Sequence, residues 1–529
     1  MRFYHPLAFW FGCAGITLGV LSHIPMFLHA APMGYQMAGM PMSTTMLIGM
    51  ALIPLGLLCS AYGVVPRVSE LRQQSDPHLQ FHVADQVPLN AEHWKLVMVL
   101  MIAVTVDVMK PATLGFVMPG MSIEYDLNSQ SAGVLAVVAL TGTTLGSIFW
   151  GMAADRFGRR AAILLSALMF IGTAICGAMP SYSWNLAMCF LMGLSAGGLL
   201  PITFALMAES VPARHRGWLL VALGGLGTTA GYLAAAGSAT LLEPLFSWRI
   251  LWLLGLPTGM IVILLNRYIP ESPRYLASRG MTHEARQVLT RFSGAQHSEQ
   301  NVVVEPEPDT GHATLKDLFR APYTGITWGL TTAGIAWGLV NFGFLLWLPT
   351  NLYSLGLAEH ANSLIAKSAF FALPGVALVI WLYHHWSSIG TLTLFTSLTA
   401  AALGVFALSA AMGWLTVEIL TACTALLLMS ASGIIAMLIP YASEIYPVHL
   451  RGTGSGLVAA SSKLGGIAGT LLGVAGLMDF LSWSALVIAA PLLLAAALLF
   501  IGGIDTRGLR LEDVRHALTA KRRRSQTYR

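Results

Sequence analysis

One short polar bend occurs twice in this sequence, and its repetition limits what the chain can fold into. Glu209-Ser-Val-Pro-Ala-Arg-His-Arg-Gly217 returns as Glu444-Ile-Tyr-Pro-Val-His-Leu-Arg-Gly452, with the glutamate, the proline, the last arginine and the glycine in the same places. Each copy lies between two long apolar segments, as a connector between helices does. The copies are too far apart for a solenoid repeat, so they predict two related helical halves that arose by duplication.

The apolar content of the chain places it in a membrane. Of its 529 residues, 56% are hydrophobic and only 10% are charged, whereas soluble domains carry about 25% charged residues. Because a crossing helix uses about 20 apolar residues, the chain is predicted to be an all-α polytopic membrane protein of about fourteen spans. Twelve of these form a regular body, predicted at residues 95–120, 131–153, 161–179, 184–208, 217–242, 248–269, 323–349, 361–383, 390–412, 416–443, 453–477 and 482–504.

Two further apolar segments, residues 7–28 and 44–65, precede this body. The first also suits a secretory signal, but its apolar stretch is long and its end is a poor cleavage pattern. Methionines gather around the uncharged hairpin between the segments, and thioether together with imidazole suits copper(I). We favour the other interpretation, in which methionine is an adaptable packing residue. The weak metal candidates are His29, Met33, Met37, Met40 and Met42.

Polar stretches divide the chain into parts. They predict an N-terminal transmembrane hairpin (1–66), a linker (67–94), a first bundle (95–269), a hydrophilic loop with short helices (270–322), a second bundle (323–505) and a basic tail (506–529). The five cysteines lie inside apolar segments without metal or redox spacing. We interpret them as buried packing residues.

Lysine and arginine concentrate on alternate connectors. If the linker, the loop at residues 156–160, the two bends, the central loop and the tail share one side, the opposite connectors carry almost no cations, with Arg249 as the exception. The positive-inside rule then predicts that both termini are cytoplasmic, and we expect a bacterial inner membrane. The net charge of +5 is modest, so we assign it to orientation and lipid contact rather than to nucleic-acid binding.

The connector between the second and third body segments reads Gly151-Met-Ala-Ala-Asp-Arg-Phe-Gly-Arg-Arg160. Its glycine allows close helix approach, and its arginines suit the headgroup region. Here the chain resembles the major facilitator superfamily, whose signature at this place is Gly-x-x-x-Asp-Arg-x-Gly-Arg-Arg. Pro270-Glu-Ser-Pro-Arg274 is similar to the segment that the sugar-porter and organic-ion branches carry after their sixth helix. The resemblance covers about residues 95–505.

This resemblance implies two pseudo-symmetric six-helix bundles, a central cavity and alternating access, with a cytoplasmic latch. The gating residues that it implies are Gly151, Asp155, Arg156, Gly158, Arg159, Arg160, Glu209, Arg216, Glu444 and Arg451. The chain departs from the pattern in two ways. The bend from Tyr383 to Gly390 has neither the aspartate nor the arginine pair, so we expect an asymmetric latch, and the two leading helices lie outside the usual twelve.

Asp107 and Lys110 lie three residues apart in the first body segment, on nearly the same helix face. A charge at the centre of a membrane helix costs about 2.5–3.5 kcal/mol on the insertion scale, so such residues normally face a wet cavity. A carboxylate beside a lysine can alternate between an ion pair and a protonated state, as proton coupling requires. We predict that Asp107 couples protons; the alternative is a static ion pair. The similar aromatic-acid/proton symporters also place acids in this helix, although their Asp-Gly-Tyr-Asp pattern is absent here.

Lysines in the second half are predicted to meet an anionic substrate. Lys463 falls near the middle of the eleventh body segment, where the chain resembles organic-anion transporters. These carry a cation at the same spacing, and the resemblance implies that this cation binds the anionic substrate. Lys367 falls in the eighth segment, where such carriers often place lysine; snorkelling to headgroups is the competing explanation. Together with Lys110, these lysines favour an anion. The predicted lining of the substrate site is Tyr232, Trp337, Asn341 and Phe342.

The sequence therefore predicts a proton-coupled carrier of a small organic anion that works as a monomer. Proton-driven export of drugs or organic cations, copper handling by the methionine hairpin, and a non-transporting receptor are the alternatives. A positive cavity argues against cationic cargo, and a receptor needs neither a latch nor buried charges. The sequence has no phosphate-cradling loop and no paired metal-ligand helix, so we predict no enzymatic activity and no cofactor.

Overall fold

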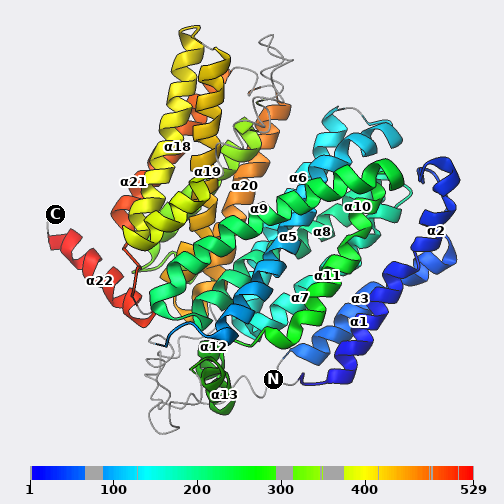
Figure 1. Cartoon of the computed structure of the whole chain (residues 1–529), viewed down its shortest axis with the longest axis horizontal. Coiled ribbons are helices and arrows are strands. Elements are labelled where there is room, and N and C mark those ends of the chain that lie inside the picture. Colours follow the sequence, from blue (N-terminus) through cyan, green and yellow to red (C-terminus); the bar gives the residue numbers. More distant parts are fainter. Residues whose placement is uncertain are drawn as a thin grey trace. The chain divides into compact units, whose positions relative to one another are not determined.

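A computed structural model describes residues 3–65, 87–127, 129–293, 314–345, 374–414, 416–475, 481–509 and 511–527, together with Leu348 and Leu477. These residues form helices and connectors, without a strand among them (Figure 1). The chain divides into two compact units. The first comprises Met1–Pro212 and Gly227–Ala313, and the second comprises Ala213–Leu226 and Thr314–Arg529.

The first unit contains the two leading helices and the body helices up to the central loop. Its elements are α1 (Pro6–Leu21), α2 (Ile24–His29), η1 (Ala31–Met33), α3 (Thr44–Val64), α5 (Ala91–Glu124), α6 (Ser129–Phe157), α7 (Arg159–Gly172), η3 (Thr173–Ala178), α8 (Tyr182–Ser210), α10 (Arg249–Leu253), α11 (Gly255–Leu264), η4 (Leu265–Tyr268), α12 (Pro273–Ser278) and α13 (Thr282–Ser293). Helix α9 (Ala213–Phe246) begins in the second unit and continues in the first.

The second unit continues from the start of α9 with α14 (Leu315–Leu318), α15 (Thr324–Gly338), the π-helix η5 (Leu339–Leu345), a helical stretch at residues 374–385, α18 (Ser388–Ala411), α19 (Val417–Ile445), α20 (Val448–Val474), α21 (Leu481–Gly502) and α22 (Leu511–Thr527). Polar side chains begin several helices of both units by accepting a free backbone N–H of the first turn, as N-caps do. These N-cap residues include Ser43, Asn90, Ser181, Ser387 and Thr416.

The predicted all-α membrane fold is confirmed. Within the described ranges, 11 helices are long and apolar enough to cross a membrane, and they include both leading segments as Pro6–His29 and Thr44–Val64. The total of about fourteen spans stays a prediction, because part of the eighth body segment, residues 361–383, lies outside the described residues.

Glycines hold the two leading helices against each other. Gly12 and Gly19 in α1 face Gly56 and Gly49 in α3, and Gly63 of α3 faces Phe9 of α1; within each helix these glycines are seven residues apart. A Cβ atom on Gly19 would lie 2.7 Å from the carbonyl oxygen of Gly49. Small residues of this kind let membrane helices approach until their backbones touch. Helices α1 and α3 therefore form a tight hairpin, which packs against α7 (Figure 1).

This interface predicts different outcomes for two glycines of the same helix. Gly19→Ala should destabilise the protein by about 1–3 kcal/mol because its methyl group meets backbone atoms. Gly15→Ala is the matched control, since its Cβ would lie 3.7 Å from the nearest atom, the Cα of Gly56. Thermal unfolding in detergent, followed by tryptophan fluorescence, measures both variants. Equal melting temperatures for the two would contradict the close contact.

Candidate functional site

Arg159 is the centre of a buried ion cluster in the first unit. Its Nη2 lies 2.9 Å from Oε1 of Glu209 and 3.1 Å from Oδ1 of Asp155, and its Nη1 donates to the carbonyl oxygen of Ala154. The Arg159 side chain is fully buried. The structure thus brings together three of the predicted gating residues, from α6, α7 and α8.

The other predicted gating residues of the first unit lie around this cluster. Arg160 donates to Oδ1 of Asn266 over 3.2 Å. Arg156 is exposed, and its guanidinium lies over the ring of Phe157. Gly151 is buried, and Gly158 adopts a φ of 103°, a backbone conformation that favours glycine.

Glu271 completes the cluster, although the sequence analysis did not single it out as a site residue. Its Oε1 accepts the backbone N–H of Arg159 at 2.7 Å, and its Oε2 accepts that of Arg160 at 3.2 Å. A Cβ atom on Gly158 would collide with this carboxylate. Glu271 therefore closes the N-terminus of α7, where free N–H groups favour an anion. The sequence feature that could have identified Glu271 is the Pro270–Arg274 segment, on which the resemblance to the sugar-porter and organic-ion branches partly rests.

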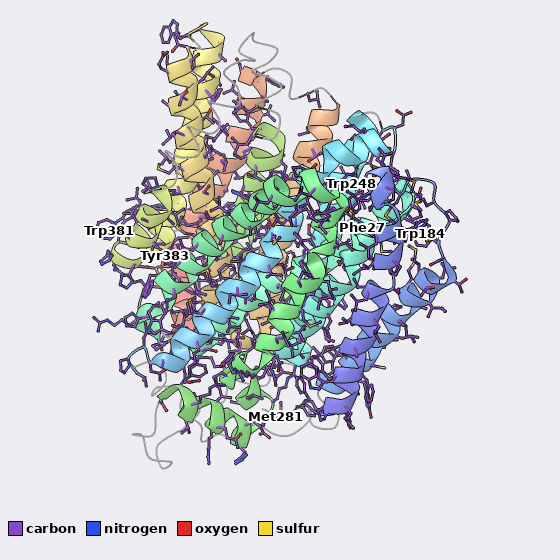
Figure 2. The ribbon with its side chains drawn as sticks, turned by 45° about the vertical axis from the view of Figure 1, so that its right-hand side comes forward. Phe27, Trp184, Trp248, Met281, Trp381 and Tyr383 are labelled. Carbon is purple, nitrogen blue, oxygen red and sulfur yellow. The ribbon has the colours of Figure 1, made fainter. Side chains whose placement is uncertain are left out.

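The second unit holds its glutamate with hydroxyl groups. Oε2 of Glu444 accepts hydrogen bonds from the Tyr383 hydroxyl at 2.8 Å and from Oγ1 of Thr506 at 2.6 Å (Tyr383 is labelled in Figure 2). The backbone N–H of Ser388, at the start of α18, donates to Oδ1 of Asp505. The bend at residues 383–390, which lacks the aspartate and the arginine pair, thus contributes the hydroxyl of Tyr383 and the N–H of Ser388 instead. The two halves therefore hold their glutamates with different groups.

The predicted arginines of the repeated bends are also buried in the second unit. Nη1 of Arg216 lies 3.4 Å from the carbonyl oxygen of Leu509, and its side chain is close enough to Glu444 to interact electrostatically. Arg451 is fully buried. Each copy of the bend therefore keeps its arginine away from water.

Asp107 and Lys110 are both buried in α5, with 3% of each residue exposed. The Lys110 amine donates to the carbonyl oxygen of Phe170 at 2.9 Å and to Oγ1 of Thr173 at 2.7 Å. It also lies 4.3 Å from the centroid of the Phe170 ring. Lys110 is thus directed towards the end of α7, and its role towards a substrate stays a prediction.

Lys463 and Trp337 come together in the second unit. Nζ of Lys463, in α20, lies 5.9 Å from the centroid of the Trp337 ring in α15. The Trp337 indole N–H donates to the carbonyl oxygen of Ala431, which fixes the ring, and the Phe342 ring stands edge-on to it at 6.3 Å. Asn341 and Phe342 are half-buried, one turn beyond Trp337.

A π-helix forms this part of the site. Segment η5 carries Asn341 and Phe342, and π-helical turns frequently occur at functional sites. A Cβ on Gly466 of α20 would lie 2.7 Å from the Phe342 ring, so the glycine makes room for that ring. The predicted site residues Lys367 and the side chain of Tyr232 lie outside the described residues.

The methionine hairpin forms an apolar cluster. Met37 and Met46 are buried together with Phe27, Ala30 and Ala178, and Met26, Met40 and Met42 pack against them. Met33 is exposed, and among the described residues no group of three or more His, Cys, Asp or Glu side chains is arranged to hold a metal ion. This arrangement favours the interpretation of methionine as a packing residue.

Two helical units with membrane-length apolar helices and buried charge clusters are typical of polytopic membrane carriers. The sequence profile of the Major Facilitator Superfamily matches residues 100–470. The chain therefore belongs to the Major Facilitator Superfamily, and it is a multi-pass membrane transport protein rather than an enzyme.

Named relatives and solved structures agree with this assignment. The niacin transporter NiaP of Acinetobacter baylyi is 27% identical over 81% of this chain and 98% of its own length. The 4-hydroxybenzoate transporter PcaK of Pseudomonas aeruginosa is 29% identical over 78% of this chain and 93% of its own length. The proton:xylose symporter XylE shares the fold at a TM-score of 0.70 and 17% identity, covering 81% of this chain and 99% of that chain. The human organic anion transporter MFSD10 covers 77% of this chain and 99% of its own at a TM-score of 0.56 and 14% identity.

The buried carboxyl of Glu271 predicts a pH dependence of stability. Glu271 lies outside the membrane-spanning segments, and burial raises the pKa of its carboxyl from 4.5 to about 7, against the opposing effects of the Ser272 N–H and Arg159. A carboxyl whose pKa is higher in the folded than in the unfolded state favours folding at pH values below its unfolded-state pKa. This contribution to stability is lost as the pH rises through about 7. In detergent, the melting temperature of the unsubstituted protein should therefore fall relative to Glu271→Gln between about pH 5 and pH 8. The exposed Glu284→Gln is the control, and a difference that stays constant across this range would contradict the assignment.

Proposed function

We propose that this transporter carries a small aromatic carboxylate and that Lys463 binds the carboxylate group. The observation that carries the proposal is the position of the Lys463 amine over the Trp337 ring, on a helix pair lined by Asn341 and Phe342. A cation among apolar side chains attracts an anion strongly, and a neighbouring aromatic wall suits a ring. The names of the relatives, which refer to niacin and 4-hydroxybenzoate, support this class of substrate.

The contact between Lys463 and Trp337 also suggests how the amine is kept ready. The Trp337 ring face is one partner of the ammonium, and a contact of this kind contributes about 0.5–2 kcal/mol. A carboxylate forms a charge-assisted hydrogen bond that is stronger than this contact. We therefore expect the substrate carboxylate to replace the ring contact of the Lys463 amine, with the aromatic part of the substrate beside Trp337 and Phe342.

Proton coupling is the second part of the proposal, and it rests on Asp107. This carboxyl is buried in a membrane helix, where protonation removes the cost of a desolvated charge. We propose that Asp107 binds and releases the co-transported proton, and that the clusters around Arg159 and Glu444 act as latches during alternating access. Both termini are proposed to lie in the cytoplasm of a bacterial inner membrane, with the monomer as the working unit.

Replacing Lys463 tests the substrate site. In proteoliposomes, Lys463→Ala should lower the initial uptake of labelled nicotinate and 4-hydroxybenzoate at least about tenfold, because a hydrogen bond to a charged group contributes about 1.5–3 kcal/mol. Lys463→Arg keeps the charge and should retain part of the uptake. Lys95→Ala, which removes a half-exposed lysine paired with Glu92, is the control. Uptake at the normal rate in Lys463→Ala would reject the site, and uptake of a labelled cation or copper(I) instead would reject the substrate class.

Replacing Asp107 tests the coupling. Asp107→Asn has nearly the same shape but cannot release a proton, so uptake should lose its response to an imposed pH gradient. Counterflow, in which labelled and unlabelled substrate exchange without net proton movement, should persist. Asp513→Asn, at an exposed position in α22, is the control. Uptake in Asp107→Asn that still rises with the pH gradient would show that another group carries the proton.

A further inference from the structure

Glu124 and Arg249 form a second buried ion pair in the first unit, far from the cluster around Arg159 along the helices. Nη2 of Arg249 lies 2.6 Å from Oε1 of Glu124, and its Nε donates to Oε2 at 3.1 Å. The Arg249 side chain is fully buried, and that of Glu124 is 5% exposed. Two parallel hydrogen bonds between a guanidinium and a carboxylate make a strong and directional pair. In the sequence, Arg249 was the exception among connectors that otherwise carry almost no cations. Its ion pair with Glu124 accounts for a cation at this position.

The pair connects the ends of several helices. Nη1 of Arg249 donates to the carbonyl oxygens of Gly177 and Met179, which follow α7, and its Nη2 donates to the Tyr125 hydroxyl. The Tyr125 hydroxyl in turn accepts a hydrogen bond from Asn185 of α8. We call Glu124, Tyr125, Asn185 and Arg249 the outer node, since they tie together α5, η3, α8 and α10.

The loop of the N-terminal hairpin binds to this node through the same carboxylate. Oε1 of Glu124 accepts the backbone N–H of Met37 at 2.7 Å and that of Ala38 at 3.1 Å. The next N–H, of Gly39, donates to the carbonyl oxygen of Pro180. The buried side chain of Met37 packs with Phe27 against Ala178 and against Ile250 and Leu253 of α10 (Phe27 is labelled in Figure 2).

The hairpin also contacts the other end of the first unit. The ring of Phe3 lies 4.9 Å from the guanidinium of Arg160, beside the cluster around Arg159. The Tyr4 hydroxyl lies 3.8 Å from the sulfur of Met281. Between these ends, Ile53 of α3 fits against Gly172 of α7. The family profile begins at residue 100, after the hairpin, so the shared family pattern does not account for these contacts.

We propose that the N-terminal hairpin is a built-in partner of the first unit, and that its docked state depends on the ion pair between Glu124 and Arg249. The Glu124 carboxylate accepts hydrogen bonds from the Arg249 guanidinium and from the two loop N–H groups. A buried carboxylate that loses its arginine must take up a proton or move towards water, because an uncompensated buried charge is costly. Either change weakens its bonds to the loop. The ion pair and the docking of the hairpin are therefore coupled, because the same carboxylate binds Arg249 and the loop.

Hydrogen exchange of the loop tests this coupling. In the full-length protein, Glu124→Gln should speed exchange of the peptide that contains the Met37 and Ala38 amides at least about tenfold, because both N–H groups lose a charged acceptor. Arg249→Gln should speed the same exchange, although it leaves the carboxylate in place. Arg249→Lys keeps the charge without the second hydrogen bond and should lie between, which provides a milder variant if Arg249→Gln does not fold.

The matched control is Glu92→Gln, at the other end of α5. Glu92 is also ion-paired, with Lys95 and Arg291, but it has no contact with the hairpin among the described residues. Its substitution should leave the exchange of the loop unchanged. Loop protection that survives in both Glu124→Gln and Arg249→Gln would overturn the docking role. Loss of protection in Glu124→Gln alone, with full protection in both Arg249 variants, would overturn the coupling.

A transport measurement extends the test and rests on the proposed function. Glu124 lies in the same helix as Asp107 but about 25 Å further along it, at 1.5 Å per residue. A released hairpin should therefore lower the maximum rate severalfold, by loosening the end of α5, with the half-saturating substrate concentration unchanged. An unchanged maximum rate together with fast loop exchange would overturn this effect on transport. Absence of uptake by the unsubstituted protein would instead count against the proposed function, and the exchange result would stand independently of it.

Discussion

A charge that is removed from water must be compensated within the protein, and this constraint organises the structure. Arg159 is surrounded by the carboxylates of Asp155 and Glu209, and Arg249 is held by Glu124 and two backbone carbonyl oxygens. Leaving one such partner uncompensated costs about 3–5 kcal/mol, whereas the complete arrangement contributes little net stability. We therefore expect these clusters to act mainly on specificity, because a packing of the helices that separates the partners leaves a buried charge uncompensated.

The two units solve the same problem with different chemistry. In the first, an arginine pairs with Glu209, and the Glu271 carboxylate closes the N-terminus of α7. In the second, Glu444 is held by hydroxyl groups, and the Asp505 carboxylate closes the N-terminus of α18. The acid that follows the last helix of each half thus occupies the same structural role, which extends the duplication beyond the repeated bends. Hydroxyl groups add no charge, so the second unit compensates Glu444 partly with neutral groups, beside the nearby Arg216.

The sequence predicted those features that short-range patterns determine. Apolar segments predicted the membrane helices, and the spacing in the connector at residues 151–160 marked the arginine that meets Asp155. Long-range pairs were not predictable in this way. Glu124 and Arg249 are separated by several helices, and no periodicity shows which carboxylate an isolated arginine will meet. The seven-residue spacing of glycines in α1 and α3 was visible, but an apolar protein with 53 glycines offers many such spacings, and only coordinates show which ones face each other.

Rigid and deformable parts are placed in different elements, which has a consequence for transport. The hairpin, α7 and the outer node share backbone contacts and buried ion pairs, and such packing has few alternative arrangements. Two residues of the predicted substrate site, Asn341 and Phe342, instead lie on a π-helix, which departs from the regular α-helical hydrogen-bonding pattern. A helix that is locally irregular can change its pitch at lower cost than a regular one. We therefore expect substrate-dependent rearrangement to be concentrated around Leu339–Leu345, while the braced helices of the first unit move together as one body.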